Sequence, residues 1–582
     1  MVKNVTLKIN NTPVTVPEGT RILDAARQAG FDIPTLCYLK DLTNEGSCRM
    51  CVVEVKGARS LVVSCVGTVS EGMEVFTNTP KVIASRKTTL ELMLSNHNKD
   101  CLSCVRSTNC ELQKLSLEYG CDDNDFAGEH SHVTVEALNP YLIRDNSKCI
   151  LCRRCVAMCS KVQSVGVIGP NRRGFNTEIG CAFERNLGDV DCVACGQCIK
   201  VCPTGALREV DDTDKVVAAL NDPEKYVIFG TAPSVRVALG EEFGMPIGTD
   251  TEGKMVAAIR RLGPDKVFDV NMTADLTIME EGNELIERLA DKNAVLPMIT
   301  SCSPGWIRFI EFNYPELLGH LSSCKSPQQM FGAVMKTYFA KLNNIDPKNI
   351  YVVSCMPCTA KKAEILRDDQ AASGYPDIDV VITTRELARL IKRYGINFES
   401  LPDEQFDDPI GYGTTAGLIF GATGGVMEAA LRTVAETVTG KPLDKVEFEA
   451  VRGTEGIKTA EVDLGGKAIK VAVVNTLSKA REIMEQIKKG ECEYTFIEVM
   501  ACPGGCVNGG GQPIVPAPLL NKGVDPRKLR AEAIYAKDAG SAIRKSHENP
   551  VIKKLYAEYF EKPGSHIAHE VLHTTYVKRE KM

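Results

Sequence analysis

Polar and apolar residues alternate along some stretches of the chain and recur at helical spacing along others. Residues 3–10 alternate and predict a strand. A Pro-Glu-Gly turn follows at 17–19, and residues 22–29 have helical spacing that ends at Gly30. A second, longer helix is predicted over residues 80–95. The chain is therefore expected to begin with a small sheet and helix, followed by a separate helical segment.

The predicted helix at 80–95 offers both charged and apolar side chains. We expect its polar face to carry Lys81, Arg86 and Lys87. The side chains available for packing are Val82, Ile83, Leu90, Leu92 and Leu94.

After residue 212, strands and helices alternate in the way typical of an α/β domain. The predicted strands lie at 226–230, 266–270 and 350–354, and the predicted helices at 252–262, 278–290 and 425–438. The segment from Gly421 to Met427 is rich in glycine but has neither the GxGxxG nor the Walker-A spacing. We interpret it as a close-packed helix start rather than a nucleotide site.

Cysteine is the residue type whose number is unusual in this composition. The 582 residues exceed the size of a single core, so several domains are expected, while 44% hydrophobic and 25% charged residues with a net charge of −6 give no sign of nucleic-acid binding. There are 24 cysteines against 8 histidines. We find no signal peptide, no twin-arginine leader and no apolar run near the ~20 residues of a membrane span. A cytoplasmic protein whose thiols bind metal is expected.

The first cysteine group is Cys37, Cys48, Cys51 and Cys65, with ten, two and thirteen residues between neighbours. The first three resemble a lengthened plant-type ferredoxin run around a [2Fe–2S] cluster. A four-thiolate zinc site is the alternative, but zinc sites usually use two Cys-x-x-Cys knuckles and only one is present. We predict a β-grasp [2Fe–2S] ferredoxin-like domain over residues 1–79.

The second group is His97, Cys101, Cys104 and Cys110. Its spacing also permits a zinc site, and a lone histidine near a helix end is often a cap. The order of one histidine and then three cysteines resembles the His-ligated [4Fe–4S] cluster of the large iron–sulfur subunit of complex I and of long iron-only hydrogenases. This resemblance favours iron, in a small helical domain over residues 80–139.

The third group contains two copies of the bacterial ferredoxin spacing C-x2-C-x2-C-x3-C, the second followed by Pro203. In that fold the fourth cysteine of each run ligates the other cluster. One predicted [4Fe–4S] cluster therefore has the ligands Cys149, Cys152, Cys155 and Cys202, and the other has Cys192, Cys195, Cys198 and Cys159. The two-cluster ferredoxin-like domain is expected at residues 140–211.

Four clusters in series can conduct single electrons but do no bond chemistry, so the reaction is expected in residues 212–582. Three motifs there carry cysteine, and they are Thr300-Ser-Cys302-Ser-Pro-Gly-Trp306, Met356-Pro-Cys358-Thr-Ala-Lys361-Lys-Ala-Glu364 and Met500-Ala-Cys502-Pro-Gly-Gly-Cys506 with its following glycines up to Pro513. With Ala232-Pro-Ser234, Thr383-Thr-Arg-Glu-Leu387 and Lys545-Ser-His-Glu-Asn549, they resemble the signatures of [FeFe]-hydrogenase. The resemblance covers almost the entire chain.

The resemblance implies an H-cluster, which is a [4Fe–4S] cubane joined by a thiolate to a two-iron unit with CO, cyanide and a dithiolate. By motif position, Cys358, Cys502 and Cys506 are cubane ligands, and Cys506 bridges the two parts. Soft thiolates suit this iron, and the diatomic ligands need a tight pocket with donors. The residues expected around the cluster are Pro233, Ser234, Gln328, Lys361, Met356 and Met500, with the two methionines as polarizable walls.

One motif departs from the family pattern. The family commonly has two adjacent cysteines in the first signature, a proton relay and then the fourth cubane ligand, whereas this chain has Cys302 followed by Ser303. By position Cys302 is the relay and Ser303 stands at the ligand place. A serine oxygen is a harder, poorer partner for iron. Ligation by Cys302 after a local shift is the alternative, and the sequence leaves both open.

Glu281, Glu284 and Arg288 are spaced to share one face of the predicted helix that contains them. The resemblance implies that they form a proton exit together with Ser322 and Cys302, as general acid–base chemistry requires. The alternative is an ordinary solvated acidic face. The five unassigned cysteines are interpreted as small buried hydrophobic residues, and they are Cys121, Cys181, Cys324, Cys355 and Cys492.

The function that this resemblance implies is oxygen-sensitive, reversible H2 oxidation and proton reduction. We expect a hydrogenase subunit of a hetero-oligomer, with ferredoxin or a flavin-containing, NAD(P)-binding subunit as partner and possible electron bifurcation. The alternatives are a self-sufficient ferredoxin-dependent hydrogenase and a non-catalytic H2 sensor or electron-transfer subunit. The last is disfavoured because Cys302, Glu281, Glu284 and Lys361 are all present.

Overall fold

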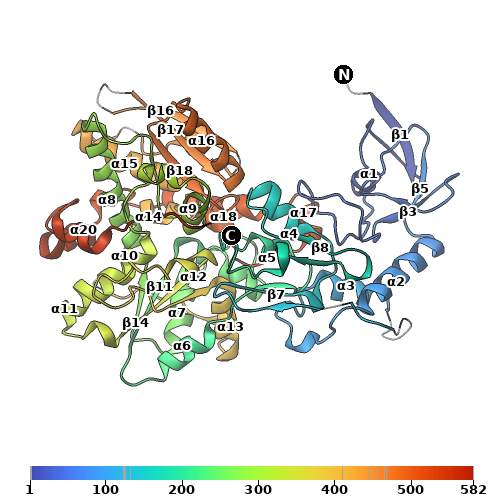
Figure 1. Ribbon diagram of the computed structural model, residues 1–582, viewed down its shortest axis with the longest axis horizontal. Coiled ribbons are helices and arrows are strands. Elements are labelled where there is room, and N and C mark those ends of the chain that lie inside the picture. The colour runs from blue at the N-terminus through green and yellow to red at the C-terminus, as the bar shows by residue number, and fades with distance from the viewer. Residues whose placement is uncertain are drawn as a thin grey trace.

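The computed structural model describes residues 3–580 except 122–125, 127, 132, 409, 444, 455, 465 and 467. The chain divides visibly into an accessory half at the N-terminal side and a larger α/β half (Figure 1). Within the described residues no helix is both long and apolar enough to cross a membrane.

The N-terminal sheet has the strand order β2-β1-β5-β3-β4. β1 and β2 form an antiparallel hairpin, β1 pairs in parallel with β5, and the inward side chains Val5, Leu7 and Ile9 are buried. This arrangement, with one helix over the sheet, confirms the β-grasp prediction. The elements are β1 (Asn4–Ile9), β2 (Thr12–Pro17), α1 (Ile22–Gln28), β3 (Val52–Val55), β4 (Val62–Val63) and β5 (Glu74–Phe76).

The helix predicted at 80–95 is α2 (Pro80–Leu94), but its predicted faces are partly wrong. Arg86 is buried and donates to Val52 O at 2.7 Å and to the Tyr119 hydroxyl at 3.1 Å. Ile83 and Leu92 are instead 46% and 52% exposed. The reason is tertiary, because the Arg86 guanidinium joins β3 to the residue that follows α3 (Glu111–Glu118).

Two short helices each contain one cysteine of a ferredoxin run, Cys155 in α4 and Cys198 in α5, and the second sheet is formed by three strands around them. This sheet has the order β10-β7-β6, and a separate hairpin is formed by β8 and β9. The elements are β6 (Val135–Glu136), β7 (Leu142–Asp145), α4 (Arg154–Ala157), β8 (Gly169–Asn171), β9 (Glu178–Gly180), α5 (Gln197–Val201) and β10 (Leu207–Glu209).

The α/β half contains two four-stranded sheets. The first is parallel throughout, with the order β12-β11-β14-β15, and the second has the order β13-β18-β17-β16 with only β16 antiparallel. The strands are β11 (Tyr226–Thr231), β12 (Lys266–Asp269), β13 (Met298–Ile299), β14 (Ile350–Met356), β15 (Val380–Thr383), β16 (Ile457–Asp463), β17 (Ala468–Asn475) and β18 (Phe496–Met500). The predicted strands are confirmed.

Helices surround both sheets (Figure 1). The helix expected at 278–290 begins earlier, at Asn271, because the segment before it is also buried along α8. The helices of this half are α6 (Thr213–Leu220), α7 (Glu252–Leu262), α8 (Asn271–Ala290), α9 (Pro304–Asn313), α10 (Pro327–Val334), α11 (Ala340–Asn343), α12 (Ala360–Glu364), α13 (Thr384–Arg393), α14 (Thr415–Ile419), α15 (Gly425–Thr439), α16 (Leu477–Lys489), α17 (Ala517–Asn521), α18 (Pro526–Ala539), α19 (Pro550–Leu555) and α20 (His566–Leu572).

The glycine-rich segment before α15 packs against backbone, as predicted. Gly424 has φ +91°, and a Cβ there would lie 2.1 Å from Val451 O. A Cβ on Gly425 would lie 1.8 Å from Ile419 O. These contacts require glycine for space, which accounts for the segment without a phosphate ligand.

Candidate active site and cluster sites

The three separated cysteine motifs meet at one cavity between the two sheets. Cys302 follows β13, Cys358 follows β14, and Cys502 follows β18, so each lies just beyond the carboxyl end of a strand. All three line the cavity together with Ser303 and Cys506. Ligands commonly bind at such strand ends in α/β folds, where several loops converge.

The thiols of this cavity are deeply buried. Burial raises the pKa of Cys358 and Cys502, and it raises the pKa of Cys506 to about 12. A buried thiol therefore keeps its proton unless a cation stabilises the thiolate. Several thiols converging in an apolar cavity are a donor set that fits an iron–sulfur centre.

Glycines let the last motif wrap tightly around the second one. A Cβ on Gly509 would lie 2.2 Å from Pro357 O, and Gly505 has φ +90° with a Cβ position 2.5 Å from Thr423 N. Larger residues would push the Cys506 loop away from Cys358. The glycines are therefore needed for the thiols to share one cavity.

Lys361 is the main charged group at the cavity wall. Its ammonium lies 2.7 Å from Ser326 Oγ, 2.9 Å from Glu364 Oε2 and 3.3 Å from Cys302 O. Gln328 donates to the same Glu364 oxygen at 2.9 Å. Glu364 lies in the same sequence motif, but no role was predicted for it. The signal that it would pair with Lys361 was its position about one helical turn later.

The other residues expected around the cluster fall into two groups. Pro233, Met356 and Met500 line the cavity, and both methionines are 3% exposed. Ser234 is buried beside them, but it is not a lining residue and its carbonyl accepts from Gln512 at 2.9 Å.

Ser303 and Cys302 face different neighbours. The Ser303 hydroxyl accepts a hydrogen bond from Ala501 N at 3.4 Å, next to Cys502. The pKa of Cys302 is raised by burial and then by the negative charge of Glu281. The structure thus places Ser303 toward the other cavity thiols and Cys302 toward the acidic residues of α8.

Those acidic residues do not form a solvated face. Glu281 is 1% exposed, its two oxygens make no hydrogen bond of normal geometry with the described residues, and burial together with the charge of Glu284 raises its pKa to about 8. Ser322 Oγ donates to Glu284 at 2.8 Å, and Arg288 Nη2 donates to Glu284 at 2.6 Å. Of the four predicted residues, Glu284 thus joins Ser322 to Arg288, and Glu281 lies buried one helical turn before Glu284 on α8.

In the N-terminal domain, Cys37, Cys48, Cys51 and Cys65 are all buried. Cys37 N donates to Cys48 Sγ at 3.3 Å. Hydrogen bonding to Cys65 lowers the pKa of Cys51 to about 7. The predicted set thus forms one cluster of thiols.

His97 is available as a ligand in the next domain. Burial and then the charge of Lys148 lower its pKa to about 4, so the imidazole is neutral at physiological pH. Its Nδ1 atom is buried without a hydrogen-bond partner among the described residues. The nearby cysteines Cys101, Cys104 and Cys110 are half-buried. An unpartnered neutral nitrogen, four residues before the first of three cysteines, fits ligation of a cluster.

The two ferredoxin runs exchange their fourth cysteines. Cys149, Cys152, Cys155 and Cys202 line one pocket. Among the other four, Cys159 lies close enough to Cys192, Cys195 and Cys198 for their charges to interact. Both sets are those predicted from the spacing.

The second ferredoxin run, from Cys192 to Cys202, contacts the active-site motifs directly, and this contact was not predicted from the sequence. Cys195 lines the same cavity as Cys502. Gln197 donates to Asn508 O at 2.9 Å, and Thr359 Oγ1 donates to Ala194 O at 2.7 Å. The accessory half and the catalytic cavity therefore share a wall.

The unassigned cysteines mostly match their prediction. Cys181, Cys324 and Cys355 are fully buried, while Cys121 and Cys492 are half-buried. Cys324 also lies near the acidic residues, with its sulfur 3.8 Å from Glu284 Oε2.

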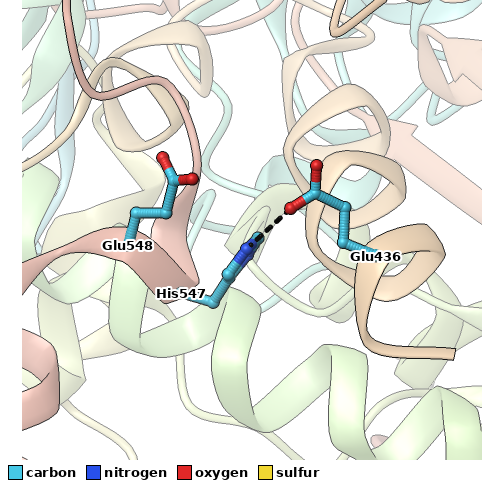
Figure 2. A group of neighbouring side chains, drawn as sticks. All are labelled: Glu436, His547 and Glu548. Carbon is cyan, nitrogen blue, oxygen red and sulfur yellow. Dashed lines mark hydrogen bonds and ion pairs between the residues drawn. The ribbon is translucent and has the colours of Figure 1, made fainter. Parts of the chain in front are cut away.

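A second group of ligand-type side chains consists of Glu436, His547 and Glu548 (Figure 2). His547 Nε2 lies 3.0 Å from Glu436, and Lys545 places its ammonium 2.8 Å from Glu436 and 3.2 Å from Glu548. Lys545 thus already supplies the positive charge. With Ser546, which donates to the buried Asp275 at 2.8 Å, the motif fastens α8 to α15.

Models of known protein families match this chain over most of its length. The matching models are the iron only hydrogenase large subunit, C-terminal domain (225–510), the iron hydrogenase small subunit (524–579), a 2Fe-2S iron-sulfur cluster binding domain (2–80), the NADH-ubiquinone oxidoreductase-G iron-sulfur binding region (86–125) and a 4Fe-4S dicluster domain (148–206).

Whole-length relatives and solved structures agree with these matches. The chain is 50% identical to the NADP-reducing hydrogenase subunit HndD of Solidesulfovibrio fructosivorans, over 99% of this chain and 100% of that one. It is 45% identical to iron hydrogenase 1 of Clostridium pasteurianum, over 98% and 100%. An apo [FeFe]-hydrogenase HydA1 variant of Chlamydomonas reinhardtii shares 41% identity with a TM-score of 0.57, covering 63% of this chain and 99% of that one.

Proposed function

Because this chain belongs to the iron-only hydrogenase family, we propose that it is the hydrogen-activating subunit of a multi-subunit, NADP(H)-linked complex. Its activity is reversible H2 oxidation and proton reduction. The observation that carries the proposal is the cavity where Cys358, Cys502 and Cys506 converge beside Cys195. Similarity along the full length of HndD supports the NADP(H)-linked assignment. We place the complex in the cytoplasm.

The cavity residues hold the H-cluster in this proposal. Cys358, Cys502 and Cys506 would hold the cubane, with Ser303 at the fourth ligand position, and Cys506 would also hold the two-iron unit. When bound, the cluster supplies the iron chemistry that interconverts H2 with two protons and two electrons. Lys361 and Gln328 orient the polar ligands of the cluster, and Met356 and Met500 exclude water with apolar walls.

Protons travel along the acidic side of α8. Cys302 exchanges a proton with Glu281, which passes it through Ser322 to Glu284. Arg288 then holds Glu284 near the surface through their 2.6 Å contact. The support is the hydrogen bonds that Ser322 and Arg288 donate to Glu284, the buried place of Glu281 one helical turn before Glu284, and the raised pKa of Glu281, which keeps a proton on that carboxyl at neutral pH.

Electrons travel through the accessory half. The cluster of Cys192, Cys195, Cys198 and Cys159 adjoins the cavity, the second ferredoxin cluster follows, and the His97 and [2Fe–2S] clusters are outermost. The proposed accessory clusters are thus four in number, and one of them is His-ligated. A ferredoxin or a flavin-containing, NADP(H)-binding subunit supplies or receives the electrons, and using both at once would make the complex bifurcating.

The proposal is tested on anaerobically matured protein copurified with its native partners. Infrared spectra are expected to show CO and cyanide stretches, and H2 formation is expected with reduced ferredoxin and NADPH together or singly. A blank infrared spectrum in a preparation with active partners contradicts the hydrogenase assignment. Activity with ferredoxin alone and no copurifying subunit would instead support a self-sufficient enzyme.

A further inference from the structure

The segment that follows α20 lies along the loop that contains Ser322. Lys325 N donates to Leu572 O at 2.8 Å, and Thr574 N donates to Ser323 O at 2.8 Å. An antiparallel bridge between Cys324 and His573 joins these two bonds. The C-terminal segment 573–576 therefore pairs with the proton-exit loop 322–325 through one antiparallel β-bridge.

His573 makes two of the side-chain contacts of this segment, and Tyr576 makes another by donating to Ser322 O at 2.7 Å. Its Nδ1 lies 2.8 Å from Ser323 Oγ and its Nε2 lies 3.2 Å from Glu280 Oε2. The side chain is only 8% exposed. Ser323 and Glu280 are each the immediate sequence neighbour of a proposed relay residue, Ser322 and Glu281. The imidazole thus spans the two elements that carry the relay.

Both contacts of His573 are secured by further bonds. Glu280 also accepts from the Tyr556 hydroxyl at 2.5 Å and from Gly564 N at 2.9 Å, so its carboxylate is fixed. Ser323 N donates to Glu284 Oε2 at 3.1 Å. A movement of Ser323 would therefore shift a hydrogen-bond donor of Glu284 itself.

We propose that His573 is a positioning residue for proton transfer, which sets the distance between Glu281 on α8 and Ser322 on the neighbouring loop. The proposal rests on the proposed function, because it assumes that protons use this row. Proton transfer requires heavy atoms within hydrogen-bond reach. A brace between the immediate neighbours of the donor and the acceptor keeps that reach when the groups exchange protons.

Three substitutions separate the two contacts of the imidazole. His573→Leu removes both, His573→Asn retains a polar atom near the Nδ1 position, and His573→Gln retains one near the Nε2 position. His569 provides the control, because it is exposed and its ring lies tilted beside that of His573, with the ring centroids 4.1 Å apart. His569→Leu is expected to leave activity unchanged.

The measurement is H2 production from a reduced viologen dye in H2O and in D2O. We expect His573→Leu to lower turnover by about tenfold and to increase the solvent isotope effect, since misplacement of reacting groups by a fraction of an ångström is costly. Infrared bands of the H-cluster and the EPR spectra of the accessory clusters are expected to stay unchanged. His573→Asn is expected to recover more activity than His573→Gln, because it keeps the contact that leads to Glu284.

Wild-type turnover and isotope effect in His573→Leu would overturn the proposal. If His573→Leu fails to fold, the Asn and Gln variants decide, and equal, wild-type behaviour of both also overturns it. Glu284→Gln distinguishes the underlying assumption. Loss of turnover in Glu284→Gln with normal His573 variants refutes only the brace, whereas normal turnover in Glu284→Gln refutes the proton route itself.

Discussion

The accessory half and the catalytic half use cysteine in different ways. In the two ferredoxin runs, three proposed ligands of each cluster lie within one short segment, such as Cys149, Cys152 and Cys155. In the catalytic half, Cys302, Cys358 and Cys502 come from separate motifs and meet only because β13, β14 and β18 end at the same cavity. One half encodes its sites locally, and the other encodes them through sheet topology.

This difference determines how far the effect of a cysteine substitution extends. A lost ligand in a local loop affects one cluster, whereas a change at the catalytic cavity affects segments that depend on one another. Cys195 is the exception to this distinction, because it belongs to a ferredoxin run and also lines the catalytic cavity. The predictions below test the distinction from the largest expected effect to the smallest.

Cys506→Ala is expected to reduce H2 activity to background, because the proposed bridge to the two-iron unit is lost. Infrared bands of CO and cyanide should disappear, while the EPR signals of the accessory clusters remain. Cys104→Ala is the matched variant of the accessory half. It should retain dye-driven H2 production and lose activity with the physiological partner, and equal losses in both assays would contradict the distinction.

Cys302→Ala is expected to abolish turnover but to keep the cubane EPR signal, because the thiol faces Glu281 and relays protons. Ser303→Cys should retain the cubane with a raised reduction potential, since a thiolate is a softer ligand for iron than a serine oxygen. EPR and redox titration measure both. Loss of the cubane signal in Cys302→Ala would make Cys302 the ligand.

Arg385→Gln tests whether the halves are independent. Arg385 donates to Gln512 O at 2.6 Å and to Gly510 O at 2.9 Å, and it pairs at 2.5 Å with Glu209 of β10 in the accessory half. Removing one partner of this buried pair should lower the free energy of unfolding by about 3 kcal/mol.

Thermal unfolding and H2 assays of Arg385→Gln should therefore show a less stable protein with slower electron delivery. The exposed pair of Arg393 and Asp214 gives the control, in which Arg393→Gln should leave the thermal stability nearly unchanged. Equal effects of the two substitutions would mean that Arg385 does not join the halves.

Glu281→Gln gives the smallest and most local effect on stability. Glu281 has a pKa of about 8 when folded and an ordinary value of 4.5, so the folded protein holds a proton that the unfolded chain releases between these values. Stability conferred by this group therefore falls as pH rises through that window. The Tm difference between variant and wild type should grow in favour of the variant from about pH 5 to pH 8, and parallel curves would refute the assignment.

Local patterns predicted much of this architecture. The grouping of Cys202 with the first ferredoxin run and of Cys159 with the second follows from spacing. The strands at 3–10, 226–230, 266–270 and 350–354 follow from alternation and apolar runs, and the close-packed start of α15 follows from glycine. Arg86 was misplaced because its partners, Val52 O and Tyr119, belong to other elements. The brace formed by His573 was missed for the same reason, since Glu280 lies almost three hundred residues earlier in the chain.

The contact between Gly196 and Gly510 sets a rule for building chimaeric enzymes. A Cβ on Gly196 would lie 2.3 Å from Thr359 Oγ1, and one on Gly510 would lie 2.4 Å from Cys195 O. A ferredoxin domain taken from another enzyme, with any residue larger than glycine at the position of Gly196, could not pack as closely against the catalytic half. Because electron tunnelling slows steeply with distance, module exchange should succeed only with donors that carry glycine there.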